Sequence, residues 1–83
     1  MDEKAQKHYE YAEKKMLEIV DQATDLRNKQ ILSQREVAKM LGMTSHGNIT
    51  MIEQHKTIPR LDNFLRLLSV YGYTLQVVPK EHR

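Results

Sequence analysis

The segment from Asp2 to Lys29 constrains the fold most, because it contains neither glycine nor proline. Apolar side chains recur in it every three or four residues, at Ala5, Tyr9, Ala12, Met16, Ile19, Val20, Ala23 and Leu26. This spacing puts them on one side of an α-helix. The segment is therefore predicted to form one long helix. Its start, up to about residue 12, carries only small or weakly apolar side chains and is expected to fray.

The length and the missing cysteines limit how such a chain can be stabilised. It has 83 residues, the size of one small domain, and domains of this size often need a disulfide, a metal ion or a second copy. The absence of cysteine excludes disulfides and thiolate metal sites, and it fits a reducing cytoplasm. No apolar run approaches the ~20 residues of a membrane span, and the charged N-terminus lacks a secretory signal core. We therefore expect a cytoplasmic homodimer that does not associate with membranes.

A short helix is predicted directly after the long one. Ser33 and Glu36 have the spacing of a capping box, which marks a helix N-terminus. The apolar residues that follow run as far as Leu41, and Gly42 suits the left-handed residue that ends many helices. The sequence thus predicts a helix of about two turns that ends in a tight turn.

Two further helices are predicted downstream of this turn. The first is expected to begin with Ser45 as its N-cap and to bury Ile49 and Ile52, which lie three residues apart. The second is expected to run over residues 59–71, because its apolar side chains follow helical spacing and proline is tolerated in a first turn. Gly72 would end it.

The last apolar segment alternates like a β-strand. Tyr73, Leu75 and Val77 are separated by polar residues, and Pro79 stops the run. A lone strand needs a partner for its backbone groups, and a second copy related by a two-fold axis would supply one. We therefore predict that this strand pairs across a dimer. The alternative is that the tail packs, extended, on its own domain.

Two short helices joined by a tight turn are the arrangement in which the second helix enters the major groove of DNA. The residues typical of such a unit are Leu32-Ser33-Gln34, Val37-Ala38, Leu41-Gly42, Ile49, Ile52-Glu53, Pro59, Leu61, Leu65 and Gly72. On these residues the chain resembles the Cro/repressor-type (XRE-type) helix-turn-helix family over residues 27–78. The expected fold is all-α: a repressor-like domain of four to five helices, with a short C-terminal β-strand. The expected parts are a long N-terminal helix over 1–26, the helix-turn-helix domain over 27–72, and the strand and tail over 73–83.

The resemblance also implies which residues face the bases. These are His46, Gly47, Asn48, Thr50 and Met51. Asparagine can bond adenine, whereas threonine and methionine can contact a thymine methyl group. No arginine or lysine lies between Met43 and His55, which favours A·T-rich half-sites. One residue more than the usual family spacing separates Gly42 from Ile49, so the register at the start of this helix stays open.

Contacts to the DNA backbone are expected from residues that flank the recognition helix. They are Ser33, Gln34, Arg35, Lys56, Thr57 and Arg60. Lys39 is interpreted as a solvated surface residue. The resemblance further implies an ion pair between Arg27 and Glu53, which would tie the first helix to the recognition helix. The alternative is that the two are separate surface charges.

Catalysis has no support in the sequence. The four histidines are scattered, and no HExxH, GxSxG or glycine-rich phosphate loop is present. A core this small also leaves little room for a deep enzymatic pocket. We expect no enzyme activity, no cofactor and no metal site.

The function predicted from these features is sequence-specific DNA binding by a transcriptional regulator, a dimeric repressor whose partners are double-stranded DNA and a second copy. Small members of this family that end in a segment like YGYTLQVVP resemble antitoxins of type II toxin–antitoxin modules, so a toxin protein is a candidate partner. The alternative is a protein-interaction module that kept the fold but lost strong DNA binding. The net charge of only +2 and the uncharged recognition helix favour that alternative.

Overall fold

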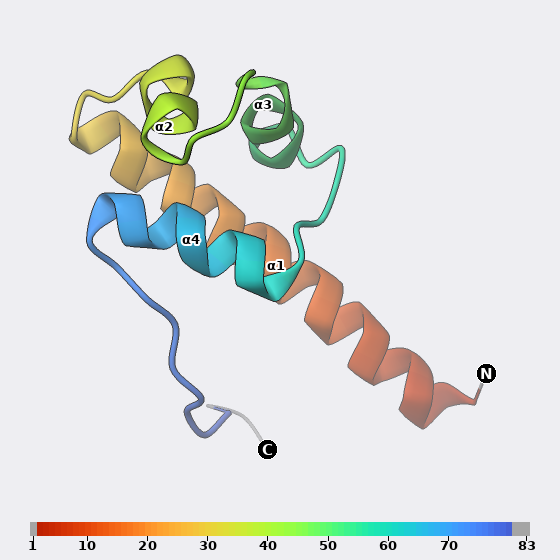
Figure 1. Ribbon diagram of the computed structural model, residues 1–83. Coiled ribbons are helices and arrows are strands. Elements are labelled where there is room, and N and C mark those ends of the chain that lie inside the picture. Colours follow the sequence, from red (N-terminus) through yellow and green to blue (C-terminus); the bar gives the residue numbers. More distant parts are fainter. Residues whose placement is uncertain (1, 81–83) are drawn as a thin grey trace.

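A computed structural model describes residues 2–80, which form four helices and no strand (Figure 1). The helices are α1 (Glu3–Lys29), α2 (Gln34–Met40), α3 (Gly47–Glu53) and α4 (Leu61–Tyr71). In Figure 1, α1 and α4 cross each other, α2 and α3 lie together on one side of them, and residues 73–80 leave on the opposite side. Residue 1 of the predicted N-terminal helix and residues 81–83 of the predicted tail lie outside the described residues.

All four helices contribute to one apolar core. Its buried members are Val20, Ala23, Val37, Ala38, Ile49, Ile52, Phe64, Leu67, Leu68 and Tyr71. α1 packs against α3 and α4, and α2 packs against the same two helices. The core therefore sits beneath α2 and α3 and fixes their position relative to the rest of the domain.

Only the C-terminal half of the α1 stripe reaches this core. Val20 and Ala23 are buried and Met16 packs against them, whereas Tyr9 is exposed. Figure 1 shows the N-terminal part of α1 extending past α4, with no other helix beside it. Asp2 caps this end by accepting a hydrogen bond from the N–H of Ala5 at 2.8 Å. Among the described residues, no helix is both long and apolar enough to cross a membrane.

Each of the four helices ends in the same hydrogen-bonded motif. In every case a left-handed residue follows the helix, and the N–H after it bonds a carbonyl five residues back, as Leu32 N does to Arg27 O at 3.1 Å. The left-handed residues are Ile31, Gly42, His55 and Gly72, with φ of 57°, 72°, 63° and 84°. The prediction for Gly42 is confirmed. A β-branched isoleucine is an unusual choice for this conformation, because its Cβ substituents crowd the neighbouring backbone.

The capping box at the start of α2 is confirmed. Glu36 N donates to Ser33 Oγ at 3.0 Å, and Ser33 N donates to Glu36 Oε1 at 2.9 Å. Hydrogen bonding to Ser33 lowers the pKa of Glu36 because it favours the carboxylate. The backbone N–H of Ser33 has the larger effect and its side chain the smaller one. The sequence signal thus sets the first residue of α2.

The predicted C-terminal strand is wrong, because residues 73–80 form neither a strand nor a helix. Strand geometry would put Tyr73, Leu75 and Val77 on one face, but Leu75 packs against the core while Tyr73 and Val77 are exposed. The N–H of Tyr73 is already used by the α4 terminus, where it bonds Leu68 O at 3.0 Å. The fold class is therefore corrected to all-α, with an extended C-terminal segment in place of the pairing strand.

The last helix is also shorter than predicted. It begins at Leu61 with Arg60 as its N-cap, so Pro59 precedes the helix instead of opening it. Leu61 is exposed, although its spacing predicted an inward position. The end at Tyr71 is confirmed, and Gly72, predicted to end the helix, is its left-handed C-cap.

Replacing Ile31 with glycine is expected to raise the free energy of unfolding by about 1 kcal/mol, since glycine adopts a positive φ without the Cβ clash. The side chain of Ile31 is 87% exposed, so little packing is lost. Urea denaturation measures the change. The matched control is Gly42→Ala, where a Cβ would meet nothing within 4 Å and only the conformational cost acts. It should lower stability by a similar amount, and a destabilised Ile31→Gly protein would contradict the assignment of strain.

The capping box predicts a pH dependence. The folded-state pKa of Glu36 lies below its ordinary value of 4.5, so the carboxylate stabilises the fold above that pH and the contribution is lost as the pH falls through the lowered folded value. Wild type is expected to be more stable than Glu36→Gln at neutral pH, and the gap should close on acidification. Urea unfolding of both proteins across this range is the measurement. Parallel stability curves would show that the carboxylate is not favoured in the folded state.

Candidate nucleic-acid interface

The helix α3, predicted to be the recognition helix, is held by its apolar side. Ile49 and Ile52 are only 2% and 5% exposed, and they insert into the core from one face of the helix. α2 is anchored in the same way by Val37 and Ala38. Between the two helices the chain turns at Gly42. With its inner side fixed by the two isoleucines, α3 presents its opposite side to solvent.

The start of α3 differs from the prediction by one residue. Its N-cap is His46, which makes no side-chain capping bond, and not Ser45. Ser45 still acts on this end, because its Oγ accepts a hydrogen bond from Gly47 N at 3.1 Å. The additional residue of the turn is thus accommodated before the helix, and the first helical residue is Gly47.

The five residues predicted to face the bases divide into two groups. Gly47, Asn48 and Met51 are exposed and lie on the open side of α3. His46 and Thr50 are half-buried at its edge. Thr50 lies beside the first residue of α2, to which it is hydrogen-bonded. The open side is uncharged, so it can approach base edges without carrying a cation of its own.

The ion pair expected between Arg27 and Glu53 is present and has two parallel bonds. Arg27 Nε donates to Glu53 Oε2 at 2.7 Å, and its second terminal nitrogen donates to Glu53 Oε1 at 2.8 Å. The first terminal nitrogen bonds Leu32 O at 2.7 Å. The side chains are 13% and 9% exposed. The hydrogen bond to Glu53 raises the pKa of Arg27. One guanidinium therefore connects α1, the segment before α2, and the end of α3.

Tyr71 of α4 lies close to this ion pair. Its hydroxyl group is buried, and no hydrogen-bond partner for it is found within residues 2–80. Burial raises the pKa of Tyr71 to about 12, and the negative charge of Glu53 adds to the rise. Tyr71 therefore stays neutral beside the ion pair.

Gln34, predicted to contact phosphate, has its side chain engaged within the protein. Its Nε2 donates to Glu53 Oε1 at 2.8 Å, and its Oε1 accepts from Thr50 Oγ1 at 2.5 Å. These bonds link residues that lie 19 and 16 positions apart in the chain. Local sequence patterns carry no signal for such contacts, so they were not predicted. Gln34 joins the start of α2 to the middle and end of α3.

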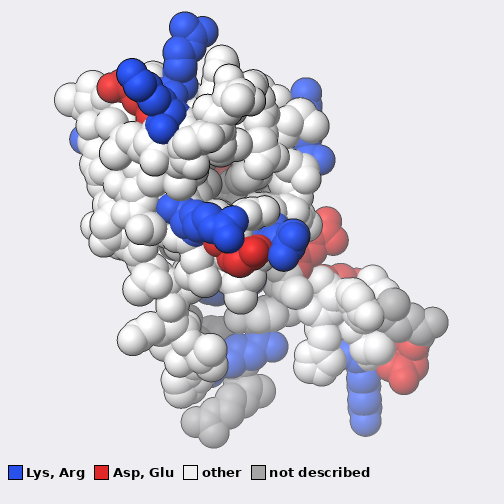
Figure 2. Space-filling view, in the orientation of Figure 1, with Lys and Arg blue, Asp and Glu red and all other residues white. Residues whose placement is uncertain are grey.

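Two cations of α2 lie beside the start of α3. Arg35 and Lys39 are four residues apart and line one shallow hollow together with His46 of α3. In Figure 2 a group of basic side chains stands over α2. Ser33 and Arg35 line an adjoining hollow. Lys39 was interpreted as a solvated residue, although its i,i+4 spacing from Arg35 could have indicated a shared face.

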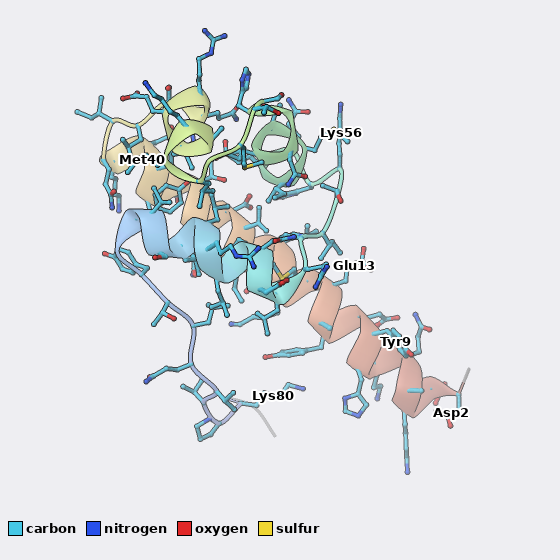
Figure 3. All side chains as sticks on the ribbon, in the orientation of Figure 1. Asp2, Tyr9, Glu13, Met40, Lys56 and Lys80 are labelled. Carbon is cyan, nitrogen blue, oxygen red and sulfur yellow. The ribbon has the colours of Figure 1, made fainter. Side chains whose placement is uncertain are left out.

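The remaining predicted phosphate contacts lie beyond the other end of α3. Lys56 is exposed on the loop after the helix and points away from the core (Figure 3), and Thr57 follows it, half-buried. This loop is tied to α1 by His55, whose Nε2 lies 2.7 Å from Asp21 Oδ1. Arg60 pairs instead with Asp62 at 3.3 Å, over α4, where Figure 2 shows a separate mixed group of charges. The structure therefore does not bring Arg60 next to Arg35.

Nothing in the described part of the chain resembles a metal centre, since no three His, Cys, Asp or Glu side chains gather there. The hollows around α2 and α3 are shallow and lined mainly by polar residues. What the arrangement offers is an uncharged helix face between cationic flanks. Such a surface can bind a groove and the phosphates on either side of it.

Similarity to known proteins supports a helix-turn-helix domain. The profile of a family described as "Helix-turn-helix" matches residues 25–78. The curated "HTH-type transcriptional regulator PuuR" of Escherichia coli K12 is 42% identical over 52 residues, which cover 63% of this chain and 28% of that protein. The protein of the same name from Shigella flexneri matches equally. The match thus spans less than a third of these relatives. No solved structure matches at a comparable level of significance.

Removing one member of the buried ion pair is expected to be costly. Arg27→Met leaves the Glu53 carboxylate without its cation, and the free energy of unfolding should fall by about 3 kcal/mol. The double variant Arg27→Met, Glu53→Met should lose less than the sum of the single variants, because it leaves no unpaired buried charge. Urea denaturation of the four proteins gives the coupling energy.

The matched control for this cycle is Arg60→Met. Arg60 also pairs with a carboxylate, but its side chain is 80% exposed. Its loss should change stability by less than about 1 kcal/mol. Equal effects of the two arginine substitutions would show that the Arg27 pair has no special role in the fold.

Proposed function

The chain belongs to the Cro/repressor-type helix-turn-helix family, and on that premise we propose that it is a sequence-specific DNA-binding transcriptional regulator. The observation that carries the proposal is the exposed, uncharged side of α3, formed by Gly47, Asn48 and Met51. α3 would enter the major groove with this side towards the bases. The protein would act by binding alone, in the cytoplasm, without catalysis or a cofactor.

The flanking cations would supply most of the affinity. Arg35 and Lys39 lie at the α2 side of α3, and Lys56 lies on the loop after it. Because α3 has no cation of its own, phosphate contacts would come from these flanks while the helix reads bases. This division accounts for a regulator with a net charge of only +2.

We further propose that the regulator is a homodimer and a repressor. Tyr9 on the projecting part of α1 and Tyr73, Val77 and Val78 of the C-terminal segment are exposed large apolar side chains. Their burial against a second copy would add the apolar contacts that a domain of this size lacks. Two copies would present two recognition helices to half-sites about 34 Å apart. Repression follows if the bound dimer occupies a promoter.

A protein partner, such as the toxin of a type II module, is the second candidate function. The observation that favours it is a groove between the N-terminal half of α1 and the segment 78–80, away from α3. Tyr11 and Val78 supply apolar surface in it, and Lys14 and Lys15 supply positive charge. Lys80 Nζ lies 3.8 Å from the centre of the Tyr11 ring and holds the two walls together. An acidic, amphipathic segment would fit this groove.

The test is titration of the purified protein with the duplex upstream of its own gene and with a scrambled duplex of the same composition, at several salt concentrations. We expect the first duplex to bind at least about 10³-fold more tightly. Asn48→Ala should weaken only that specific binding. Arg35→Ala should weaken binding to both duplexes and reduce the salt slope by about 1.

The matched control for Arg35 is Arg66→Ala, because Arg66 lies on α4 and is engaged by Asn63 at 2.8 Å. It should change neither affinity nor slope. Light scattering should give twice the chain mass of 9.8 kDa for the free protein. Equal, weak binding to both duplexes would exclude self-repression and leave either a regulator of another site or the protein-interaction module.

A further inference from the structure

Gln34 lies between the ion pair of the interface and a residue predicted to read DNA. Its amide nitrogen faces Glu53 at 2.8 Å, and its amide oxygen faces the Thr50 hydroxyl at 2.5 Å. All three side chains are largely shielded from solvent. The orientation of one group in this series therefore constrains the orientation of the next.

The order of donors and acceptors follows from the charge of Glu53. Its carboxylate accepts two bonds from Arg27, so it is ionised and can only accept. The group that Gln34 turns towards it must therefore be the NH₂ and not the carbonyl. This leaves the carbonyl oxygen of Gln34 facing Thr50. Because a carbonyl only accepts, the Thr50 hydroxyl has to donate its proton to it.

The alternative partner of the Thr50 hydroxyl leads to the same result. Thr50 Oγ1 also lies 3.2 Å from the carbonyl oxygen of His46, one turn earlier in α3. Both acceptors belong to the protein. In either case the single hydroxyl proton of Thr50 is used internally and is not available to a base.

We propose that Thr50 reads DNA through its methyl group, by contact with the C5-methyl of a thymine, and that Gln34 is the positioning residue that enforces this. The inference rests on the proposed function. With the hydroxyl proton used internally, Thr50 cannot donate to a base, and its methyl group would make the contact. An apolar contact with the thymine methyl is the form of readout that such a group can make.

The experiment starts from DNA that the protein itself selects. Wild-type protein is used to enrich binders from a pool of random duplexes, and the preferred duplex is resynthesised with each thymine replaced in turn by uracil, which lacks the C5-methyl. At one position per half-site the affinity should fall about fourfold, the factor that burial of roughly one methyl group at about 0.8 kcal/mol contributes.

Two variants of Thr50 assign this loss to the protein methyl group. Thr50→Ser keeps the hydroxyl and removes the methyl, so it should bind the thymine duplex about fourfold more weakly and show no further loss with uracil. Thr50→Val keeps a methyl and removes the hydroxyl, so it should retain the full thymine-to-uracil effect. Circular dichroism of each variant checks that α3 is still folded.

Gln34→Met tests the positioning role. It removes both amide contacts, and we expect the ratio of thymine to uracil affinity at that position to shrink. A residue with only a structural role would weaken binding to all duplexes equally.

Four further outcomes would overturn the inference. A full uracil effect in Thr50→Ser, or its loss in Thr50→Val, would show that the hydroxyl does the reading. Selection of a preferred duplex in which no uracil replacement matters would overturn the inference and leave the regulator intact. A pool that yields no preferred duplex would overturn the regulator, and the inference with it.

Discussion

The bidentate ion pair between Arg27 and Glu53 is the contact on which the interface depends. α3 has only seven residues, begins with glycine and contains β-branched side chains, so it would not persist as an isolated helix. The negative charge of Glu53, the last residue of α3, is also unfavourable beside the negative end of the helix dipole. A cation from α1 offsets that disadvantage and fixes the C-terminal end of α3, while Ile49 and Ile52 fix its inner side. The proposed recognition helix is thus a product of tertiary contacts.

This dependence separates two properties that DNA-binding helices usually combine. Because its neighbours hold α3 in place, its open side is free of any structural duty and can consist of small, neutral residues such as Gly47 and Asn48. The cations lie elsewhere, on Arg35 and Lys39 of α2 and on the loop after α3. Under the proposed function, affinity would come mainly from these flanks and base selection mainly from α3.

Features with a local cause were predictable from the sequence. The α2 capping box, the left-handed Gly42 and the helix end at Gly72 depend on residues a few positions apart, and all three were predicted. Features with a non-local cause were not. The Gln34 contacts span 16 and 19 residues, and the C-terminal segment alternates like a strand but follows the packing of Leu75 instead. The Arg27–Glu53 pair, 26 residues apart, was predicted only through the family resemblance.

α1 is a single uninterrupted helix and is therefore rigid along its length. Its C-terminal end holds α3 through Arg27, while its N-terminal half projects beyond the domain and carries Tyr9 and Tyr11. An α-helix advances about 1.5 Å and turns about 100° per residue. A partner bound to the projecting half would therefore be held at a fixed rotation about the α1 axis and at a fixed distance from α3. One residue inserted between these halves would swing the docked partner about a quarter turn around the axis, without altering any contact in the core.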